Sequence, residues 1–143
     1  MEKNIEELFN TIVQFKSVIS NLYSEGENGR ATMLQFSALN YIQVNADISV
    51  AQLGSLLHLS KSSCTQLIER LEKAGFIKRI QDEKDRRIIH LSISETGKKE
   101  LGESKKKILT KLKVIFSHLP EEDIKDLIRI HKSLLVKLTL KQA

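Results

Sequence analysis

Apolar residues recur at helical spacing in the first part of the chain. In residues 5–22 they fall every three or four positions, which predicts an amphipathic helix. Residues 24–29 have the composition of a loop, and a second helix is expected over about residues 32–44. The chain is therefore predicted to begin with two consecutive helices.

Two shorter helices are predicted next, in close succession. Ser49 and Ser60 each precede an apolar-periodic segment, where a serine side chain can cap a helix. A tight connection at residues 58–59 separates the two helices, and the second is expected to run to about Ala74. Gly75 then stands where a left-handed C-terminal cap would form.

The hydrophobic period changes from 3.6 to 2 after this glycine. Residues 76–81 and 88–93 read as two strands, and the charged hexapeptide 82–87 joins them in a β-hairpin with a projecting loop. Helical spacing returns from Ser94 to about residue 116, and a last helix starts at Pro120, which is tolerated in a first turn. The expected fold is mainly α with a small β-hairpin wing (α+β), namely a winged helix-turn-helix lobe plus long helices.

Composition limits the class of protein. The chain has 143 residues, which fits a single domain over 1–143. It has no apolar run long enough to span a membrane and no secretory leader, so a cytoplasmic protein is expected. Its formal net charge is +5, and the basic residues concentrate in the second half, which favours a polyanionic partner.

The helix from Ser60 has two contrasting faces. Cys64, Leu67, Ile68 and Leu71 form an apolar face that we expect to pack inward. Serine, threonine and glutamine on the other face can hydrogen-bond base edges in a major groove, although every surface helix has some solvated polar face. The candidate DNA-binding residues of this helix are Ser62, Ser63, Thr65, Gln66 and Arg70, with Lys73 as a further phosphate contact.

The hairpin tip carries the second candidate site. Its hexapeptide is formally neutral, so net charge alone does not explain a role in binding an anion. An arginine positioned by an acidic neighbour such as Asp85 could enter a narrow minor groove. Arg86 is the first candidate, with Lys84 and Arg87 as alternatives; Asp85 and Arg87 could instead brace the wing, and a solvated, salt-bridged turn is the simplest interpretation.

Nearly the whole sequence resembles the MarR family of bacterial transcriptional regulators. The resemblance is strongest over residues 48–79, and it is most specific where the Asp-Arg-Arg of residues 85–87 is followed by Ser-Glu-Thr-Gly at residues 94–97. It implies a homodimer in which residues 1–30 and 98–143 supply the dimerisation helices and residues 31–97 the DNA-binding lobe. Two such lobes would bind successive major grooves of a near-palindromic operator.

The resemblance also implies a small-molecule effector whose binding weakens the interaction with DNA. The effector would lie between the dimerisation helices and the DNA-binding lobe. Tyr23, Phe36 and Tyr41 are aromatic residues that could line such a pocket, although core packing is the simpler role for each. The sequence does not identify the effector.

Other chemistry has little support in the sequence. The single cysteine excludes an internal disulfide and a cysteine-based zinc cluster; a redox-responsive regulator acting through Cys64 stays an alternative. The four histidines lack the paired spacing of metal ligands, and His90 is expected on the outer side of the hairpin, near phosphate. No catalytic or cofactor motif is present, so we expect no enzyme activity, cofactor or metal.

The preferred interpretation is a sequence-specific repressor that binds double-stranded DNA, and an activator stays an alternative because nothing in the sequence fixes the sign of regulation. The main alternative from another class is a winged-helix module that binds a protein through the same surface. Such a module would bind DNA weakly and without sequence preference.

Overall fold

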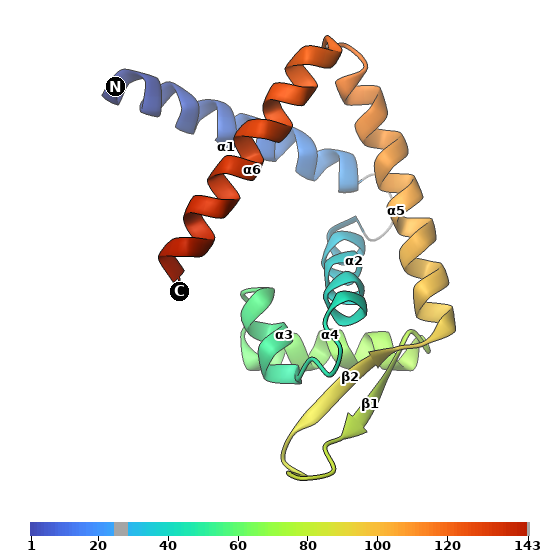
Figure 1. The fold of residues 1–143 in the computed structure, drawn as a ribbon. Helices are drawn as coiled ribbons and strands as arrows, with labels where there is room; N and C mark the ends of the chain where they lie inside the picture. Colours follow the sequence, from blue (N-terminus) through green and yellow to red (C-terminus); the bar gives the residue numbers. More distant parts are fainter. Residues whose placement is uncertain (25–28, 143) are drawn as a thin grey trace. The chain divides into compact units, whose positions relative to one another are not determined.

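The computed structural model describes residues 1–24 and 29–142, and the surroundings of side chains in residues 1–20 and 33–138. In these parts the chain forms six helices and one two-stranded hairpin, which confirms the predicted fold class (Figure 1). The elements in chain order are α1 (Glu2–Ser24), α2 (Gly29–Val44), α3 (Val50–Leu56), α4 (Lys61–Lys73), β1 (Ile77–Gln81), β2 (Ile89–Ile93), α5 (Glu95–Phe116) and α6 (Glu121–Gln142).

The largest deviation from the expected helix boundaries is at the start of α2. This helix begins at Gly29, whereas the apolar periodicity predicted a start near residue 32. The difference has a simple cause, because the predicted apolar stripe begins only at Leu34, and a first turn whose single apolar residue is Ala31 gives no periodic signal.

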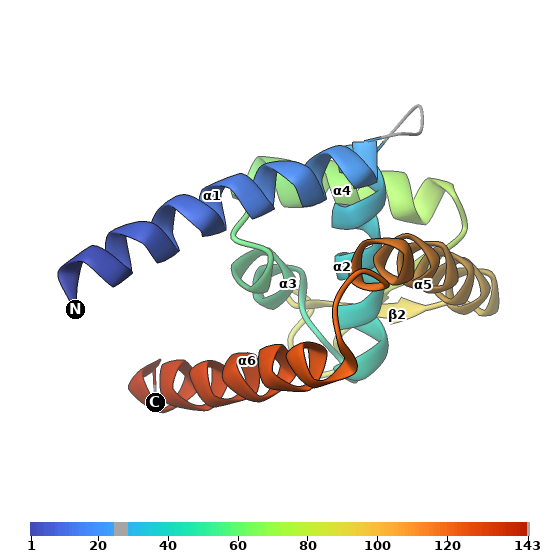
Figure 2. The same ribbon diagram turned by 90° about the horizontal axis from the view of Figure 1, so that it is seen from above.

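A single hydrophobic core joins α2, α3, α4 and the hairpin. Leu39, Leu53, Ile68 and Leu71 are all at most 1% exposed and come from the three helices. The four residues predicted to form the inner face of α4 are buried, as expected. Figures 1 and 2 show α2, α3 and α4 grouped together, with the hairpin leading away from the end of α4.

The hairpin is antiparallel, and Ile77 pairs with Ile93 at its base. Its second strand, β2, pairs with β1 along one edge, and along the other edge the N–H of Leu91 donates a hydrogen bond to the Ile48 carbonyl at 2.9 Å. An isolated bridge between Ser49 and His90 extends this contact. The second strand of the wing is thus tied to the turn between α2 and α3, while the loop at its tip projects away from the core (Figure 1).

The start of α5 packs closely on the residues that follow α4. Ser94 caps α5 by accepting the N–H of Gly97, and its own hydroxyl donates to the Gly75 carbonyl. Gly97 is buried, and a β-carbon there would lie 2.1 Å from the Phe76 carbonyl oxygen. Only glycine allows α5 to approach so closely the residues that follow α4 in the chain.

The chain divides into two compact units, Met1–Lys107 and Ile108–Ala143. Each unit contains a helix with an exposed apolar stripe. In α1 the stripe includes Phe9, which is 63% exposed, and in α6 it includes Leu135, which is also 63% exposed. Within the described residues, no helix has the length and hydrophobicity needed to cross a bilayer.

Candidate nucleic-acid interface

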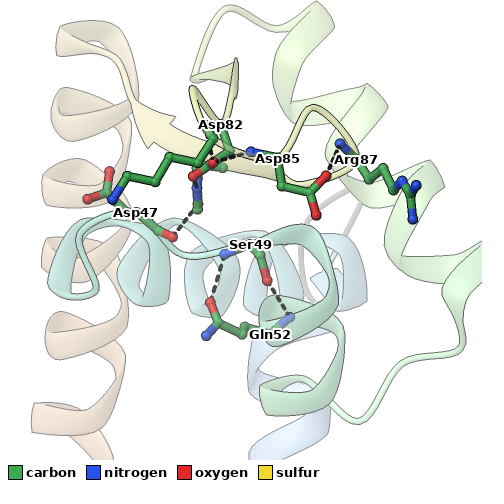
Figure 3. A network of polar contacts seen from close by, with 8 residues as sticks. Asp47, Ser49, Gln52, Asp82, Asp85 and Arg87 are labelled. Atoms are coloured by element: carbon green, nitrogen blue, oxygen red, sulfur yellow. Dashed lines mark hydrogen bonds and ion pairs between the residues drawn. The ribbon is translucent and has the colours of Figure 1, made fainter.

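Local hydrogen bonds fix both ends of α3, including the turn that leads into α4. Ser49 starts α3 with a capping box, in which its hydroxyl accepts the Gln52 N–H and the Gln52 side chain accepts the Ser49 N–H (Figure 3). At the other end of α3, the His58 N–H donates to the Ser55 carbonyl and the Leu59 N–H to the Gly54 carbonyl. These two bonds form a Schellman motif.

His58 occupies the left-handed position of this motif, with a φ of 52°. A residue with a β-carbon rarely adopts this conformation, so the turn is held by its hydrogen bonds and by the packing of α3 on α4. The turn reverses the chain within a few residues. As a result α4 packs against α3 through its inner face, and neither α2 nor α3 covers its outer face.

The outer face of α4 carries the predicted polar residues. Ser62, Ser63, Gln66 and Arg70 are exposed, and Thr65 is half-buried at the edge of the face. Gln66 and Arg70 line a shallow hollow together with Glu69 and Lys73. The candidate base-contacting residues are therefore brought together on one accessible surface.

Two of the predicted hydroxyl groups already have partners inside the helix. The Thr65 hydroxyl donates to the Lys61 carbonyl at 2.9 Å, so it retains only acceptor capacity for a ligand. The Ser63 hydroxyl accepts from that of Ser60, which caps the helix by accepting the Ser63 N–H. Ser63 can still donate its own hydrogen, as can the Gln66 amide.

The wing loop is organised by carboxylates that bind the main chain. Asp82 accepts the N–H groups of Lys84 and Asp85, each at 2.8 Å, and Asp85 accepts the N–H of Arg87 at 3.0 Å (Figure 3). These contacts are typical of Asx turns, in which an aspartate stabilises the turn that follows it. The contact between Asp85 and Arg87 thus involves the arginine main chain and not its guanidinium group.

The basic side chains of the loop are accessible. Lys84, Arg86 and Arg87 are exposed, and none of them forms an ion pair with another described residue. By contrast Arg79, on β1, is paired with Glu72 of α4 at 3.0 Å. The loop therefore presents three cations while its aspartates bind backbone amides.

His90 was expected to lie near a phosphate, but both nitrogens of its ring contact other residues of the protein. Its Nε2 lies 2.7 Å from Asp82 Oδ2, and its Nδ1 lies 2.6 Å from the Asp47 carbonyl oxygen. The hydrogen bond that His90 donates to Asp82 raises the pKa of His90, and the same bond, with the two loop amides, lowers the pKa of Asp82 to about 2. The sequence interpretation missed this pair.

The hairpin register could have revealed the pair. Ile80 pairs with His90, which places Asp82 two residues further along on the same face, as a diagonal neighbour. The contact with Asp47 could not be found in this way. It depends on a main-chain carbonyl in the α2–α3 turn, at a residue with a positive φ of 58°.

The remaining candidates serve the core where the structure describes them. Cys64 is 2% exposed, and burial raises the pKa of its thiol, which disfavours the reactive thiolate form. Phe36 and Tyr41 pack against the hydrophobic core, whereas the Tyr23 side chain lies outside the described residues. Over those residues no three His, Cys, Asp or Glu side chains gather as metal ligands.

Comparisons with known proteins agree with this geometry. The model of the MarR family matches residues 31–89. The HTH-type transcriptional regulator YsmB of Bacillus subtilis is 26% identical over 124 residues, which cover 87% of this chain and 81% of YsmB. The transcriptional repressor MprA of Escherichia coli is 36% identical over a shorter segment, 43% of this chain and 35% of MprA.

A solved structure extends the similarity beyond the matched segment. The transcriptional regulator BldR from Sulfolobus solfataricus superposes with a TM-score of 0.75 at 24% identity, over 94% of this chain and 96% of BldR. The fold is therefore shared along nearly the whole chain, including the helices outside residues 31–89. Residues 31–89 of the chain therefore match the MarR family, and the relatives that the chain resembles are described as transcriptional regulators.

Proposed function

We propose that this protein is a homodimeric repressor that binds a near-palindromic operator and is released from it by a small molecule. One observation carries the proposal. The outer face of α4 exposes hydrogen-bonding side chains while its inner face is buried, and the same lobe carries a wing whose basic side chains are unpaired among the described residues. This division of faces fits a recognition helix in a major groove.

Within α4, Ser62, Ser63, Thr65 and Gln66 are our candidates for contacts with base edges. Their order along the helix suits this role, because the N-terminal residues of a recognition helix reach the bases. Gln66 can form a bidentate pair with adenine, while Arg70, one turn further along, suits a phosphate. The accepting hydroxyl of Thr65 fits a donor such as the cytosine amino group.

In the wing, Arg86 is our candidate for the minor groove, with Lys84 and Arg87 as the alternatives. The exposed cations support this assignment, since a narrow minor groove has an enhanced negative potential. Asp85 would keep the loop in shape through its bond to the Arg87 amide. An arginine residue held at the end of such a loop loses less conformational freedom on binding.

The dimer is supported by the exposed apolar stripes of α1 and α6. In α6 the stripe includes Leu134 and Leu138, which are more than half exposed in the single chain. Contiguous apolar surface of this kind usually marks an interface. We propose residues 1–30 and 98–143 as the dimerisation region and residues 31–97 as the DNA-binding lobe.

The proposals that the protein represses transcription and that it binds an effector rest on its similarity to the MarR family and to MprA, whose name describes a repressor. A regulator of this kind acts where the chromosome lies, so we propose a cytoplasmic location. The buried, high-pKa thiol of Cys64 does not favour the redox alternative. A protein-binding module remains the second candidate function, because the same exposed surface could contact a protein.

Selection of bound fragments from the source genome, followed by salt titration of the recovered duplexes, tests the proposal. We expect a near-palindrome bound at least several hundredfold above bulk DNA, since specific sites typically exceed nonspecific ones by about 10³–10⁷. Weak, sequence-independent binding that disappears with salt would contradict the proposal and favour the protein-binding module. Adding small molecules to the complex then identifies those that release it.

A further inference from the structure

His90 connects the wing to the rest of the DNA-binding lobe through two contacts in opposite directions. One nitrogen contacts the Asp82 carboxylate, which holds the wing loop by accepting the N–H groups of Lys84 and Asp85. The other contacts the main-chain carbonyl of Asp47, in the turn between α2 and α3. Figure 3 shows Asp82 on the wing and Asp47 on the neighbouring turn. The imidazole therefore lies between the loop and its support.

The partners of His90 define its protonation state. A carboxylate and a carbonyl oxygen are both acceptors only, whereas a neutral imidazole has a single N–H. In the neutral ring, one bare nitrogen would face an oxygen lone pair at 2.6 or 2.7 Å. Only the imidazolium, which donates from both nitrogens, satisfies both contacts at once.

The charges around His90 favour the imidazolium. Asp82 faces it from its own hairpin and Asp47 from the α2–α3 turn, and both are acidic. Lys78 lies on the same hairpin face, opposite Ser92, and α3 contains no ionisable residue. The His90 side chain is 20% exposed, so the surrounding solvent weakens these interactions without removing them.

We propose that protonated His90 is a positioning residue for the wing, which it holds against the α2–α3 turn, so that loss of its proton loosens the wing and lowers operator affinity. The inference concerns affinity for DNA and to that extent rests on the proposed function. The effect on the wing itself does not require DNA.

The direction of the pH dependence follows from the two groups. The pKa of His90 is raised from 6.5, so its contribution is complete below pH 6.5 and is lost as the pH rises through the raised value. The pKa of Asp82 is lowered from 3.8 to about 2, so its contribution is complete above pH 3.8 and is lost only in strong acid. The contact is therefore intact at mildly acidic pH and is released on the alkaline side.

The first test measures affinity for the duplex recovered by genomic selection, at constant ionic strength. As the pH rises from about 6 through the raised pKa of His90, wild-type affinity should fall by about three- to tenfold, where tenfold corresponds to one pKa unit of coupling. The His90→Gln variant should bind weakly with little change over this range, because a neutral amide replaces the imidazole. The control His118→Gln removes an exposed histidine elsewhere and should keep the wild-type pH profile.

A second test uses the DNA-free wild-type protein and does not depend on how the variants fold. Nitrogen-15 NMR of the imidazole rings should show that the pKa of His90 lies above the ordinary histidine value, with protons on both His90 nitrogens at pH 6.5. Hydrogen exchange at the Lys84 and Asp85 amides, corrected for its intrinsic pH dependence, should accelerate as His90 titrates.

Two results would overturn the inference. One is a pH profile in His90→Gln that matches the wild type; the other is a neutral His90 at pH 6.5 with no change at the wing amides as it titrates. Failure of the proposed function would give a different result, because neither the wild type nor the variants would then bind any duplex specifically at any pH. The NMR measurement would still decide whether His90 positions the wing.

Discussion

At the residue scale, the wing separates acidic and basic groups that its sequence intermixes. Asp82 and Asp85 bind main-chain N–H groups, while the neighbouring Lys84, Arg86 and Arg87 stay exposed. A formally neutral hexapeptide can therefore present cations to a phosphate backbone. The aspartates contribute to the shape of the loop, and the cations remain available for DNA.

Arg86→Ala and Arg87→Ala test this division of roles. Each single substitution should weaken operator binding, by about tenfold or about 1.4 kcal/mol for the residue that enters the minor groove. The loop should keep its shape, because its aspartates contact main chain. Fluorescence anisotropy with the operator duplex measures the effect, and Arg129→Ala, an arginine paired with Asp126 on α6, is the matched control. Unchanged affinity in both single variants and the double variant would show the wing assignment to be wrong.

Gly97 gives a prediction about stability. In Gly97→Ala the new methyl group would collide with the Phe76 carbonyl, so the start of α5 must shift. We expect the free energy of unfolding to fall by about 1–3 kcal/mol, as for other overpacked sites. Gly102→Ala is the control within the same helix: nothing lies within 4 Å of the new atom, and alanine should stabilise the helix by up to about 1 kcal/mol. Equal urea midpoints for the two variants would contradict this account.

At the element scale, α4 is defined by its two ends. Ser60 caps the N-terminus, and Gly75 ends the helix with a φ of 75°. The Gly75 N–H donates to the Glu72 carbonyl and the Phe76 N–H to the Leu71 carbonyl, which completes a second Schellman motif. Both ends were predicted from sequence, because caps depend on local chemistry.

Ser60→Ala and Ser62→Ala separate helix stability from base contact. Loss of the Ser60 cap should lower the free energy of unfolding by about 1 kcal/mol. Ser62 lies on the exposed face one residue inside α4, so Ser62→Ala should change stability little and should weaken operator binding. Thermal melts and anisotropy on both variants measure the two effects. If Ser62→Ala destabilised the protein as much as Ser60→Ala, our assignment of the cap would fail.

At the scale of the whole molecule, the apolar stripes of α1 and α6 are the main unsatisfied feature. Phe9 and Ile12 of α1 are more than half exposed, as are Leu134 and Leu138 of α6. At about 25 cal/mol per Å² of buried apolar surface, leaving such stripes in water would be costly. We propose that a second copy of the chain covers them, which would account for their size and regularity.

The double substitution Leu134→Glu with Leu138→Glu tests the dimer. Because charges would then occupy the apolar stripe, the protein should sediment as a monomer at concentrations where the wild type is a dimer. Specific operator binding should be lost, since a single lobe contacts one half-site. Lys137→Glu changes charge on the same helix and should leave the dimer intact. Sedimentation of the double variant identical to that of the wild type would exclude α6 from the interface.

The sequence by itself determined the elements, the caps and the candidate face of α4. Helical and strand periodicity depend on which residues are apolar, and caps depend on residues close in the chain, so both can be recognised from the order of residues alone. The inward face of Cys64, Leu67, Ile68 and Leu71 was predicted correctly for this reason. Base contacts, wing contacts and the dimer remain predictions, because each depends on a partner molecule.

Only the tertiary structure decided how the wing is held. The bond from His90 to the Asp47 carbonyl joins residues 43 positions apart, and the approach of Gly97 to Phe76 depends on how α5 leaves the hairpin. Neither leaves a periodic signal, because a main-chain carbonyl is present at every residue and its accessibility depends on the surrounding fold. The sequence thus specified which surfaces could act, and the packing of hairpin, turn and helix fixed their geometry.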